Sequence, residues 1–232
     1  MIVYIPVGNG PVRREYIAAG AGMIVTRADF RFPKLDCPWI FDNGAFQDYL
    51  DGKEFGEVKF VRCIDRLMKV QPCQRPAWCV TPDIVADKNS LGFSVGWRKD
   101  LPHALNWYLA LQDGMEEAHV ENALSTAKFS GLFVGGSLTW KNENAARWCA
   151  FGRAYKLPVH IGRLNGGRRL QWAVNIGASS VDGTGWTQDS RWVHWVRSVR
   201  HPEGPEGLLF DDVAQDLESH RRAAKGRKAG AG

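Results

Sequence analysis

The chain of 232 residues is long enough to bury a full hydrophobic core, which excludes a linker, a fragment or a disulfide-stapled mini-protein. Hydrophobic residues make up 44% and charged residues 24% of the sequence, close to the average of soluble globular proteins, so a disordered or fibrous chain is excluded as well. No run of 18 apolar residues occurs, and the first residues lack a basic segment followed by a long apolar one. We therefore expect no membrane span and no secretion, and we expect a cytoplasmic protein.

The formal net charge of +5 comes from the end of the chain. Five basic residues lie within the last twelve, and the rest of the chain is close to neutral: Arg221, Arg222, Lys225, Arg227 and Lys228. A basic, glycine- and alanine-rich tail is typical of a solvated end, and it is also able to contact phosphates non-specifically. The five cysteines are odd in number and form no Cys-x-x-Cys pair, so we expect reduced thiols, several of them buried, without a disulfide framework or a common zinc motif.

Short apolar runs rich in branched and aromatic residues recur along the chain, and each is followed by a turn signal. Eight of these runs predict strands, at 2–7, 23–26, 39–41, 78–81, 107–111, 132–134, 159–161 and 179–181. Helical patterns fit between most of them, at 11–19, 54–70, 115–129, 139–156, 166–176 and 187–199. Strands that alternate with helices predict a parallel sheet with right-handed crossovers.

Eight such units in a chain of this length predict a single-domain α/β fold of the (β/α)8 barrel type, with an open doubly wound sheet as the alternative. No Gly-x-Gly-x-x-Gly follows the first strand and no Walker A motif is present, which disfavours a dinucleotide or nucleoside-triphosphate site. The stretch 201–210 is a proline- and glycine-rich break before a last predicted helix at 211–224. We therefore predict a barrel domain over 1–210 and a C-terminal helix with a basic tail over 211–232.

Polar residues cluster where the predicted strands end, which is the end of a barrel that carries chemistry. The segments that follow six strands are 42–47, 82–83, 112–114, 135–137, 162–163 and 182–184. Each one alone also fits a turn, because Asp-Asn-Gly and Asp-Gly are common turn sequences and a glycine pair after a strand is typical of backbone geometry. Phe46 alone fits a core position. Three carboxylates and an amide on one face would nevertheless be costly to gather without a ligand.

These segments, in this order, resemble motifs of the tRNA-guanine transglycosylase superfamily, whose members exchange guanine for a 7-deazaguanine base in nucleic acid. Residues 41–47 resemble that family's Asp-Ser-Gly-Gly-aromatic-Gln segment, and residues 177–182 resemble its Gly-x-Asp-x-Phe-Asp segment, which carries the nucleophile. Residues 82–84 are similar to its Ser-Asp-Ile and 111–114 to its Val-Gln-Gly-Gly. Two shorter blocks, 135–138 and 161–162, are similar to its Gly-Gly-Leu and Met-Gly. The six blocks span residues 41 to 182.

The resemblance implies a role for each matched position. Asp182 would be the carboxylate that attacks the sugar C1′, and Asp42 a general base for the proton of the incoming base. Asp83, Gln112 and the backbone of Gly136 would read the polar edge of the base. Phe46 and Ile161 would cover its two faces, and the resemblance places Gly135 and Gly162 in the same base-binding site. Replacing one N-glycosidic base by another with retention needs two displacements through a covalent intermediate, and such chemistry needs no cofactor and no metal.

The sequence also departs from the family pattern. The family's tRNA enzymes carry a cysteine and histidine zinc site after the nucleophile, whereas no cysteine follows Cys149 here, so we expect a barrel without a zinc-binding subdomain. The family's Pro-Thr-Arg is replaced by residues 183–186, and Ser179 stands where a further Asp is usual. A barrel of this kind looks more like the phage and bacterial enzymes that modify DNA, in the host cytoplasm where a phage encodes them. The resemblance therefore favours DNA over tRNA as polymer and a preQ0-type 7-deazaguanine base as small-molecule substrate.

An enzyme of either type must move its target base out of the stack, and exposed tryptophans can support unstacked bases. Trp186, Trp192 and Trp195 are candidates for this role, although Trp192 and Trp195 at a spacing of three also fit the core face of one helix.

Two other classes of protein remain open at this stage. One is a metal-dependent barrel hydrolase or lyase that uses Asp42, Asp83 and Asp182, although His160 is the single histidine near a predicted strand end. The other is a nucleic-acid-binding barrel without catalysis. The oligomeric state does not follow from the sequence.

Overall fold

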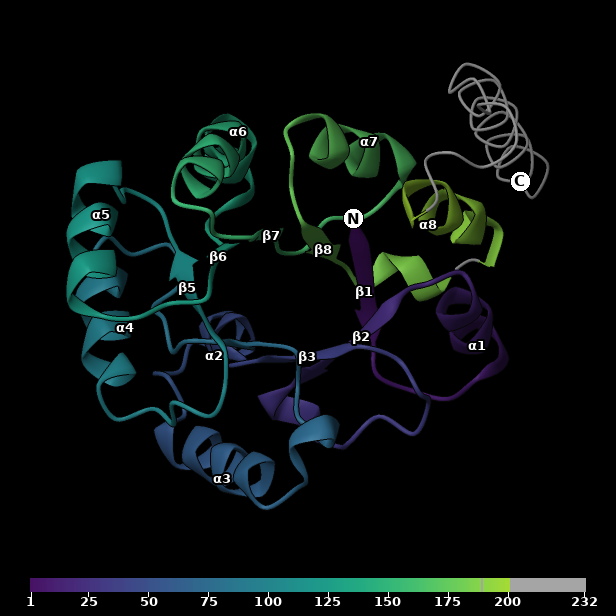
Figure 1. Ribbon diagram of the computed structural model, residues 1–232, viewed down its shortest axis with the longest axis horizontal. Helices are drawn as coiled ribbons and strands as arrows, with labels where there is room; N and C mark the ends of the chain where they lie inside the picture. The colour runs from purple at the N-terminus through teal and green to yellow at the C-terminus, as the bar shows by residue number, and fades with distance from the viewer. Residues whose placement is uncertain (189, 201–232) are drawn as a thin grey trace, which may run out of the picture. The chain divides into compact units, whose positions relative to one another are not determined.

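A computed structural model describes residues 1–188 and 190–200 of the chain, and in it eight parallel strands close into a barrel (Figure 1). The strands follow one another around the barrel in chain order. Their bounds are β1 Ile2–Pro6, β2 Gly22–Thr26, β3 Trp39–Asp42, β4 Cys79–Val80, β5 Trp107–Leu111, β6 Gly131–Val134, β7 Val159–Ile161 and β8 Ser180–Asp182. The compact unit that contains them is Met1–Arg200, and it has the predicted TIM-barrel fold.

Strand β1 closes the barrel because it pairs with both β2 and β8. Its residue Tyr4 stands in register with Gly22 of β2 on one side and with Asp182 of β8 on the other. Every neighbouring pair of strands is parallel, so all eight carboxyl ends open at the same end of the barrel. We call this end the mouth.

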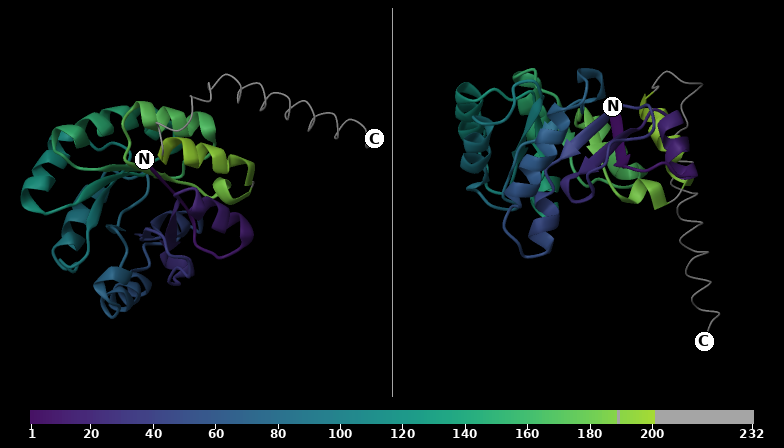
Figure 2. Two further views of the ribbon diagram at one scale, coloured as in Figure 1. Left: turned by 45° about the vertical axis from the view of Figure 1, so that its right-hand side comes forward. Right: turned by 90° about the horizontal axis from the view of Figure 1, so that it is seen from below.

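Helices surround the strands, as Figure 1 shows down the barrel and Figure 2 from two further directions. Their bounds are α1 Pro11–Ala18, α2 Ala45–Leu50, α3 Glu57–Met68, α4 Ser90–Arg98, α5 Glu117–Thr126, α6 Leu138–Ala154, α7 Gly167–Asn175 and α8 Val193–Arg200. Short 3-10 turns lie at Arg27–Asp29, Pro72–Gln74, Gly185–Gln188 and Ser190–Trp192. Helix α1 begins at a proline, whose fixed φ suits a first helical turn, and α6 begins at Ser137, whose hydroxyl accepts from the Trp140 N–H.

The inside of the barrel is filled by side chains of alternate strand residues, since successive residues of a strand point to opposite faces. One buried cluster consists of residues from the strands and their immediate flanks: Tyr4, Ile24, Ile40, Trp78, Val80, Tyr108 and Ala110. Trp78 and Tyr108 stack with ring centroids 4.1 Å apart. Gly131 leaves room for this layer, because a Cβ there would lie 2.4 Å from the Tyr108 ring. Large rings opposite glycines therefore fill the barrel as a packed core and not as a pore.

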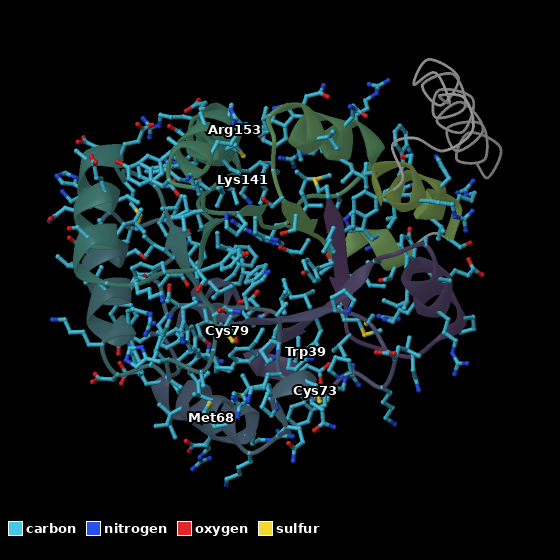
Figure 3. The ribbon with its side chains drawn as sticks, in the orientation of Figure 1. Trp39, Met68, Cys73, Cys79, Lys141 and Arg153 are labelled. Carbon is cyan, nitrogen blue, oxygen red and sulfur yellow. The ribbon has the colours of Figure 1, made fainter. Side chains whose placement is uncertain are left out.

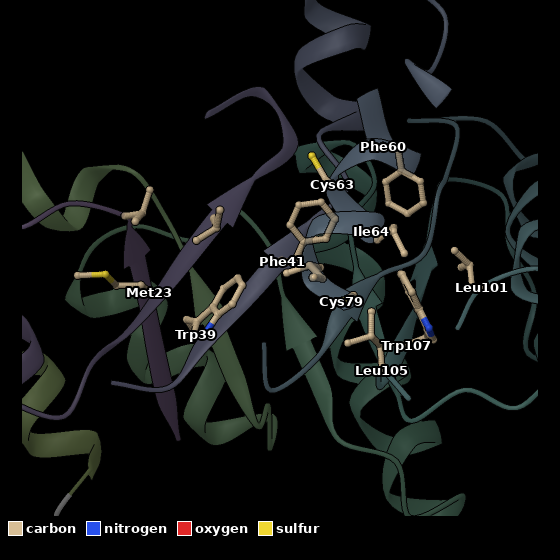
Figure 4. Packing of buried hydrophobic residues seen from close by; sticks show 13 residues of the cluster. Met23, Trp39, Phe41, Phe60, Cys63, Ile64, Cys79, Leu101, Leu105 and Trp107 are labelled. Atoms are coloured by element: carbon tan, nitrogen blue, oxygen red, sulfur yellow. The ribbon is translucent and has the colours of Figure 1, made fainter. Parts of the chain in front are cut away.

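The other face of the strands packs against the helices, and Figure 4 shows part of this second cluster. Phe41 of β3 and Trp107 of β5 meet Phe60, Ile64 and other residues of α3 there. The Phe41 and Phe60 rings stack at 6.1 Å, and all four side chains are almost completely buried. Strands that are buried on both faces explain why the strand sequences are continuous apolar runs without polar alternation.

The eight predicted strands are confirmed, with ends that differ by at most one residue. Five predicted helices are confirmed with shorter bounds, and the sixth, 187–199, is partly wrong because its first half is two 3-10 turns and α8 begins only at Val193. The sequence analysis missed α2 and α4. Helix α4 contains Gly92 and Gly96, which lower helix propensity, and tertiary contacts such as the hydrogen bond from Ser94 Oγ to Pro82 O (2.7 Å) hold it in place.

Three predictions fall outside the part of the chain that the structure describes. These are the break at 201–210, the helix at 211–224 and the basic tail, and with them the boundary between the predicted barrel domain and the C-terminal segment. All five cysteines lie within the described part and are free thiols, and Cys63, Cys79 and Cys149 are buried as predicted. No helix of the described part is long and apolar enough to cross a membrane.

Candidate active site at the carboxyl ends of the strands

The first loop of the mouth follows β3 and carries Asp42. The chain turns sharply at Gly44, where φ is +75°, a conformation that favours glycine. This turn points the Gly44 N–H back at Asp42, whose Oδ1 accepts from it at 2.8 Å. The carboxyl group of Asp42 is half-buried, and no other hydrogen bond to it is found among residues 1–188 and 190–200. One turn thus orients a carboxyl group that retains an oxygen without a partner.

A buried arginine fixes the same loop from below. The Arg27 guanidinium donates to Gly44 O (3.3 Å) and to Gly56 O (2.8 Å), and it forms an ion pair with Asp48 of α2. Asp48 also accepts from the Gly56 N–H at 2.9 Å, and the guanidinium lies 4.7 Å from the centre of the Phe55 ring. With its charge paired and most of its donors used, Arg27 has the environment of a residue that holds the loop and not of one that meets a ligand.

A hydrogen-bond network joins the loops that follow β3, β4, β5 and β6. Asp83 accepts from the Asn43 amide at 2.6 Å and, with its other oxygen, from the Gln112 amide. The Gln112 carbonyl accepts in turn from the Gly136 N–H (2.9 Å) and from the Ala86 N–H (3.0 Å). Sequence analysis grouped three of these residues as readers of a base edge, and the structure brings them together, but the Gly136 N–H is used by Gln112 and is not free for a ligand.

Two carboxyl groups of the mouth have raised pKa values. Burial raises the pKa of Asp42 to about 6, and the negative charge of Asp182 adds to this while the Gly44 N–H opposes it. Burial likewise raises the pKa of Asp83 to about 7, against the effect of the amide donors of Asn43 and Gln112. Near neutral pH both groups are therefore able to take up or release a proton.

Asp182, at the end of β8, lies in a different environment. Its Oδ1 is 2.9 Å from Nε2 of His160 and accepts from the Arg163 N–H at 3.2 Å. Its Oδ2 has no hydrogen-bond partner within the described ranges, and 12% of its side-chain surface is exposed. The other ring nitrogen of His160 lies 2.8 Å from Ser180 Oγ. The structure thus holds one oxygen of Asp182 in place and leaves the second available.

Arg163 lies among the carboxylates of the mouth. Its guanidinium lies over the Phe46 ring, 3.8 Å from the centroid, and donates to Gly136 O. Burial lowers the pKa of Arg163, whereas the charges of four nearby aspartates raise it, first among them Asp182 and Asp42. Its backbone has a φ of +56°, which is unusual for a residue other than glycine and points the Arg163 N–H at Asp182. The ring face that sequence analysis assigned to a base is covered here by this guanidinium.

Gly135 and Gly162 directly follow β6 and β7, at positions where a larger residue would collide with its neighbours. A Cβ at Gly135 would lie 2.5 Å from the Gln112 amide, and a Cβ at Gly162 would lie 2.6 Å from the Phe133 ring.

Lys141 of α6, labelled in Figure 3, donates to Gly162 O and is 1% exposed. Burial lowers the pKa of this amine to about 7, with Arg163 adding to the effect and Asp182 opposing it. The lysine fixes the loop that carries Arg163.

Four predicted side-chain roles do not agree with these positions. Ile161 is fully buried and follows His160, which faces the inside of the barrel, so Ile161 faces the helices and is not placed to cover a base. Trp186 and Trp195 are buried, and the Trp186 N–H donates to Leu164 O. Trp192 lies in a 3-10 turn and not on one helix with Trp195, and it contacts Trp186 edge to face at 5.8 Å. Only Trp192 is half-exposed.

The sequence analysis did not assign a role to four residues that contact this site: Asn43, Ser180, Arg163 and Lys141. A signal existed for Ser180, because a residue two positions before Asp182 on a strand faces the same side. The same rule places His160 on the inner face of β7, although sequence analysis considered His160 only as a metal ligand. No such periodicity was available for Lys141, which reaches the site from a helix.

No group of three or more His, Cys, Asp or Glu side chains placed to hold a metal ion occurs in the part of the chain that the structure describes. Comparison of the sequence with protein-family models and with curated proteins finds no match. The assignment of a function therefore depends on the fold and on the residues of the mouth.

Proposed function

We propose that this protein is a base-exchange transglycosylase, which replaces guanine in nucleic acid by a 7-deazaguanine base of the preQ0 type. The observation that carries the proposal is the pair of carboxyl groups formed by Asp182 and Asp42. One oxygen of Asp182 is held by two donors while the other has no partner in the described part of the chain, and its charge adds to the burial that raises the pKa of Asp42 to about 6. Two carboxyl groups with different environments at one site are typical of double displacement at a sugar C1′.

In the first displacement, Asp182 Oδ2 attacks C1′ of the target nucleotide. The bond between Oδ2 and C1′ forms while the bond between C1′ and the guanine nitrogen breaks, and the guanine takes a proton from Asp42. In the second displacement, the ring nitrogen of the incoming base attacks C1′, its proton goes to Asp42, and the Asp182 carboxylate leaves. Sugar, bases and enzyme are balanced at the end of this cycle, and the chemistry needs no cofactor.

Asp42 suits this proton transfer because burial raises its pKa and the negative charge of Asp182 raises it further. In the free enzyme the Asp182 carboxylate helps to keep Asp42 protonated, which is the form that the departing guanine needs. Once Asp182 is esterified to the sugar its negative charge is gone, so the pKa of Asp42 falls. The ionised form, which the incoming base needs as a proton acceptor, is then favoured.

The base is held by the network around Asp83 and Gln112. Asp83 accepts from two amides and has further lone pairs, and one Gln112 amide hydrogen is not used in the bond to Asp83, so this pair can accept from and donate to the edge of a purine-like ring. A Cβ at Gly135 would collide with the Gln112 amide and a Cβ at Gly162 with the Phe133 ring, so both glycines allow the packing around this network. The Phe46 ring supplies one face of the site, and a base that stacks on it displaces the Arg163 guanidinium.

DNA is the favoured polymer and tRNA the alternative. This preference comes from the departures of the sequence from the tRNA-modifying enzymes that it resembles, because no cysteine follows Cys149 for a zinc subdomain. Either polymer has to present its target base outside the stack.

The test is an exchange assay with labelled preQ0-type bases and either duplex DNA or tRNA. We expect stable incorporation of label into DNA with release of one guanine for each base incorporated, without added metal. Asp51→Asn, which changes an exposed carboxylate of the loop after α2, serves as the matched control for variants of Asp42 and Asp182 and should exchange like the unmodified protein.

Each alternative gives a different result. Incorporation into tRNA alone would reverse the choice of polymer. Cleavage that depends on added Zn²⁺ or Mg²⁺ would favour a metal-dependent hydrolase, and binding of polymer without incorporation or cleavage would favour a non-catalytic nucleic-acid-binding barrel. In the last two cases the proposed exchange reaction is wrong.

A further inference from the structure

His160 lies inside the barrel, next to the carboxylate that we propose as nucleophile. It is the middle residue of β7 and has no exposed surface. Its ring stacks on Phe133, with centroids 5.1 Å apart and planes 15° apart, and meets the edge of Trp78 at 4.9 Å. Tyr4 contacts it from β1 at 6.0 Å. With aromatic rings of three neighbouring segments around it, the imidazole has little freedom to rotate.

The hydrogen bonds of His160 define which nitrogen carries the proton. An ionised carboxylate is an acceptor only, so the ring nitrogen that faces Asp182, Nε2, must be the donor. Burial lowers the pKa of His160 and so favours the neutral ring, although Asp182 acts in the opposite direction. A neutral ring protonated at Nε2 has a lone pair on Nδ1, and Ser180 Oγ lies 2.8 Å from that nitrogen as its donor.

Ser180 and Asp182 stand two residues apart on the same face of β8, so one strand contacts both nitrogens of the ring. The resulting chain runs from the Ser180 hydroxyl to His160 Nδ1, and from His160 Nε2 to Asp182 Oδ1. A second donor, the Arg163 N–H, reaches the same oxygen of Asp182. Both donors therefore act on Oδ1, and neither acts on Oδ2.

We propose that His160, oriented by Ser180, is a positioning residue for Asp182, which selects Oδ2 as the attacking atom and stabilises the carboxylate when it leaves the sugar. This inference rests on the proposed function. During the first displacement Oδ2 becomes bonded to C1′ and Oδ1 becomes the carbonyl oxygen of the ester. During the second, the bond between C1′ and Oδ2 breaks and negative charge returns to the carboxylate. The His160 and Arg163 N–H groups meet that charge, so they contribute most when the intermediate breaks down.

The kinetic test separates the two displacements. Formation of the covalent sugar adduct on Asp182 is followed by intact-protein mass spectrometry without incoming base, and its decay is followed after the base is added. We expect His160→Leu to slow the decay roughly 10- to 100-fold, as a lost hydrogen bond to a charged group implies, and to slow formation less. His160→Gln, which is able to donate to Oδ1, should restore most of the rate. The KM for the incoming base should not change.

A matched control is His119→Gln, which changes a histidine of α5 whose side chain is 70% exposed and to which we assign no role in this site. Ser180→Ala should slow the decay by a few-fold, because the ring keeps its packing and loses only the donor to Nδ1. Equal rates of decay for the unmodified protein and His160→Leu would overturn the proposal, and so would a His160→Gln variant as slow as His160→Leu.

A second measurement does not depend on activity and reads the tautomer in the unmodified protein. The ring nitrogens of the unmodified protein, labelled with ¹⁵N at histidine, are observed by long-range ¹H–¹⁵N correlation, and the His160 signals are identified by their loss in His160→Gln. We expect a neutral ring with its hydrogen on Nε2, and a change of both signals in Asp182→Asn. A hydrogen on Nδ1 would overturn the proposal. The predicted tautomer in a protein that forms no adduct would instead contradict the proposed function, and with it the role in catalysis, while leaving the hydrogen bond established.

Discussion

The carboxyl groups on the two sides of the barrel mouth differ in how many of their oxygens are hydrogen-bonded. On the side of β3 to β6, Asp83 accepts from two side-chain amides, and burial still raises its pKa to about 7. On the side of β7 and β8, Asp182 has its donors on one oxygen only and keeps the other oxygen without a partner in the described part of the chain. The first arrangement suits a group that reads a ligand by hydrogen bonds, and the second suits a group that reacts.

The difference comes from the elements that supply the partners. Asp83 meets the amides of Asn43 and Gln112, which come from the loops after β3 and β5 and are polar but uncharged. Asp182 meets a ring inside the barrel and a backbone N–H of the next loop. Asp42 shares one feature with each of the two groups. Like Asp182 it has its donor on one oxygen only, and like Asp83 it has a raised pKa, of about 6. Five predictions test this difference between the carboxyl groups.

The largest effect is expected for Asp182→Asn. An amide is a poor nucleophile, so exchange should fall by about 10⁴-fold or more. The measurement is incorporation of labelled base, together with the absence of a covalent adduct in the mass spectrum. The free energy of unfolding should be similar to that of the unmodified protein. Substantial exchange by this variant would remove Asp182 from the role of nucleophile.

The next largest effect is expected for Asp42→Asn, which removes the carboxyl group that we propose as proton donor and acceptor. Exchange should fall roughly 10²- to 10³-fold, within the range of general acid–base catalysis. In the unmodified protein, adduct formation needs protonated Asp42 and should decline as the pH rises through about 6. This decline should disappear in Asp42→Asn. The same pH dependence in both proteins would show that another group transfers the proton.

A smaller effect is expected for Asp83→Ala, and it should appear in binding. A polar group of the bound base that loses Asp83 as its partner costs about 1–3 kcal/mol, so the Kd for free base should rise roughly 5- to 150-fold, as measured by calorimetry. Polymer affinity should be unchanged. Unaltered affinity for the base would limit Asp83 to a structural role.

Asp83 also has a predicted effect on stability, whose sign follows from its raised pKa. Between its ordinary value of 3.8 and about 7 the folded protein binds a proton that the unfolded chain has lost, so the contribution of Asp83 to the free energy of unfolding decreases as the pH rises through this window. Asp83→Asn, which does not titrate, should lack this decrease. Urea unfolding of both proteins at pH 5 and pH 8 measures the difference.

The smallest effect is expected for Arg163→Ala. Its guanidinium covers the Phe46 ring, so a base no longer has to displace it in this variant, and base affinity should increase roughly 2- to 30-fold, the range of a cation–π contact. The exposed Arg168 of α7 provides a matched control, since Arg168→Ala removes the same charge outside this stack. Weaker binding by Arg163→Ala would make the guanidinium itself a wall of the base site.

The fold followed from the sequence because burial on both faces leaves a strong local pattern. Runs such as 107–111 are apolar without interruption, and their alternation with helical segments admits few topologies. Helix α4 could not be predicted in this way, because its two glycines and buried serines give no helical stripe, and contacts with the barrel decide its conformation. The same holds for α2, whose six residues follow a turn that the sequence presents as a loop.

The sequence predicted which residues lie at the mouth of the barrel. It did not predict which way their side chains point. Asp42, Asp83, Gln112 and Asp182 follow strands, and the barrel gathers whatever follows its strands at one mouth. Ile161 lies in the same part of the chain, yet its place on the outer face of β7 points it to the helices. The contact of Arg163 with Phe46 joins the loop after β7 to helix α2, more than one hundred residues away in the chain, and no local pattern predicts it.

The sequence by itself determined the eight strands and the order of polar residues at their ends, since hydrophobic periodicity and turn chemistry are local properties of the chain. The tertiary structure alone decided which of those residues share hydrogen bonds, which oxygen of Asp182 is held, and which carboxyl groups have raised pKa values. The physical reason is that desolvation and hydrogen-bond geometry depend on what surrounds a group in space, and in a barrel those surroundings come from strands and helices that are distant in the chain.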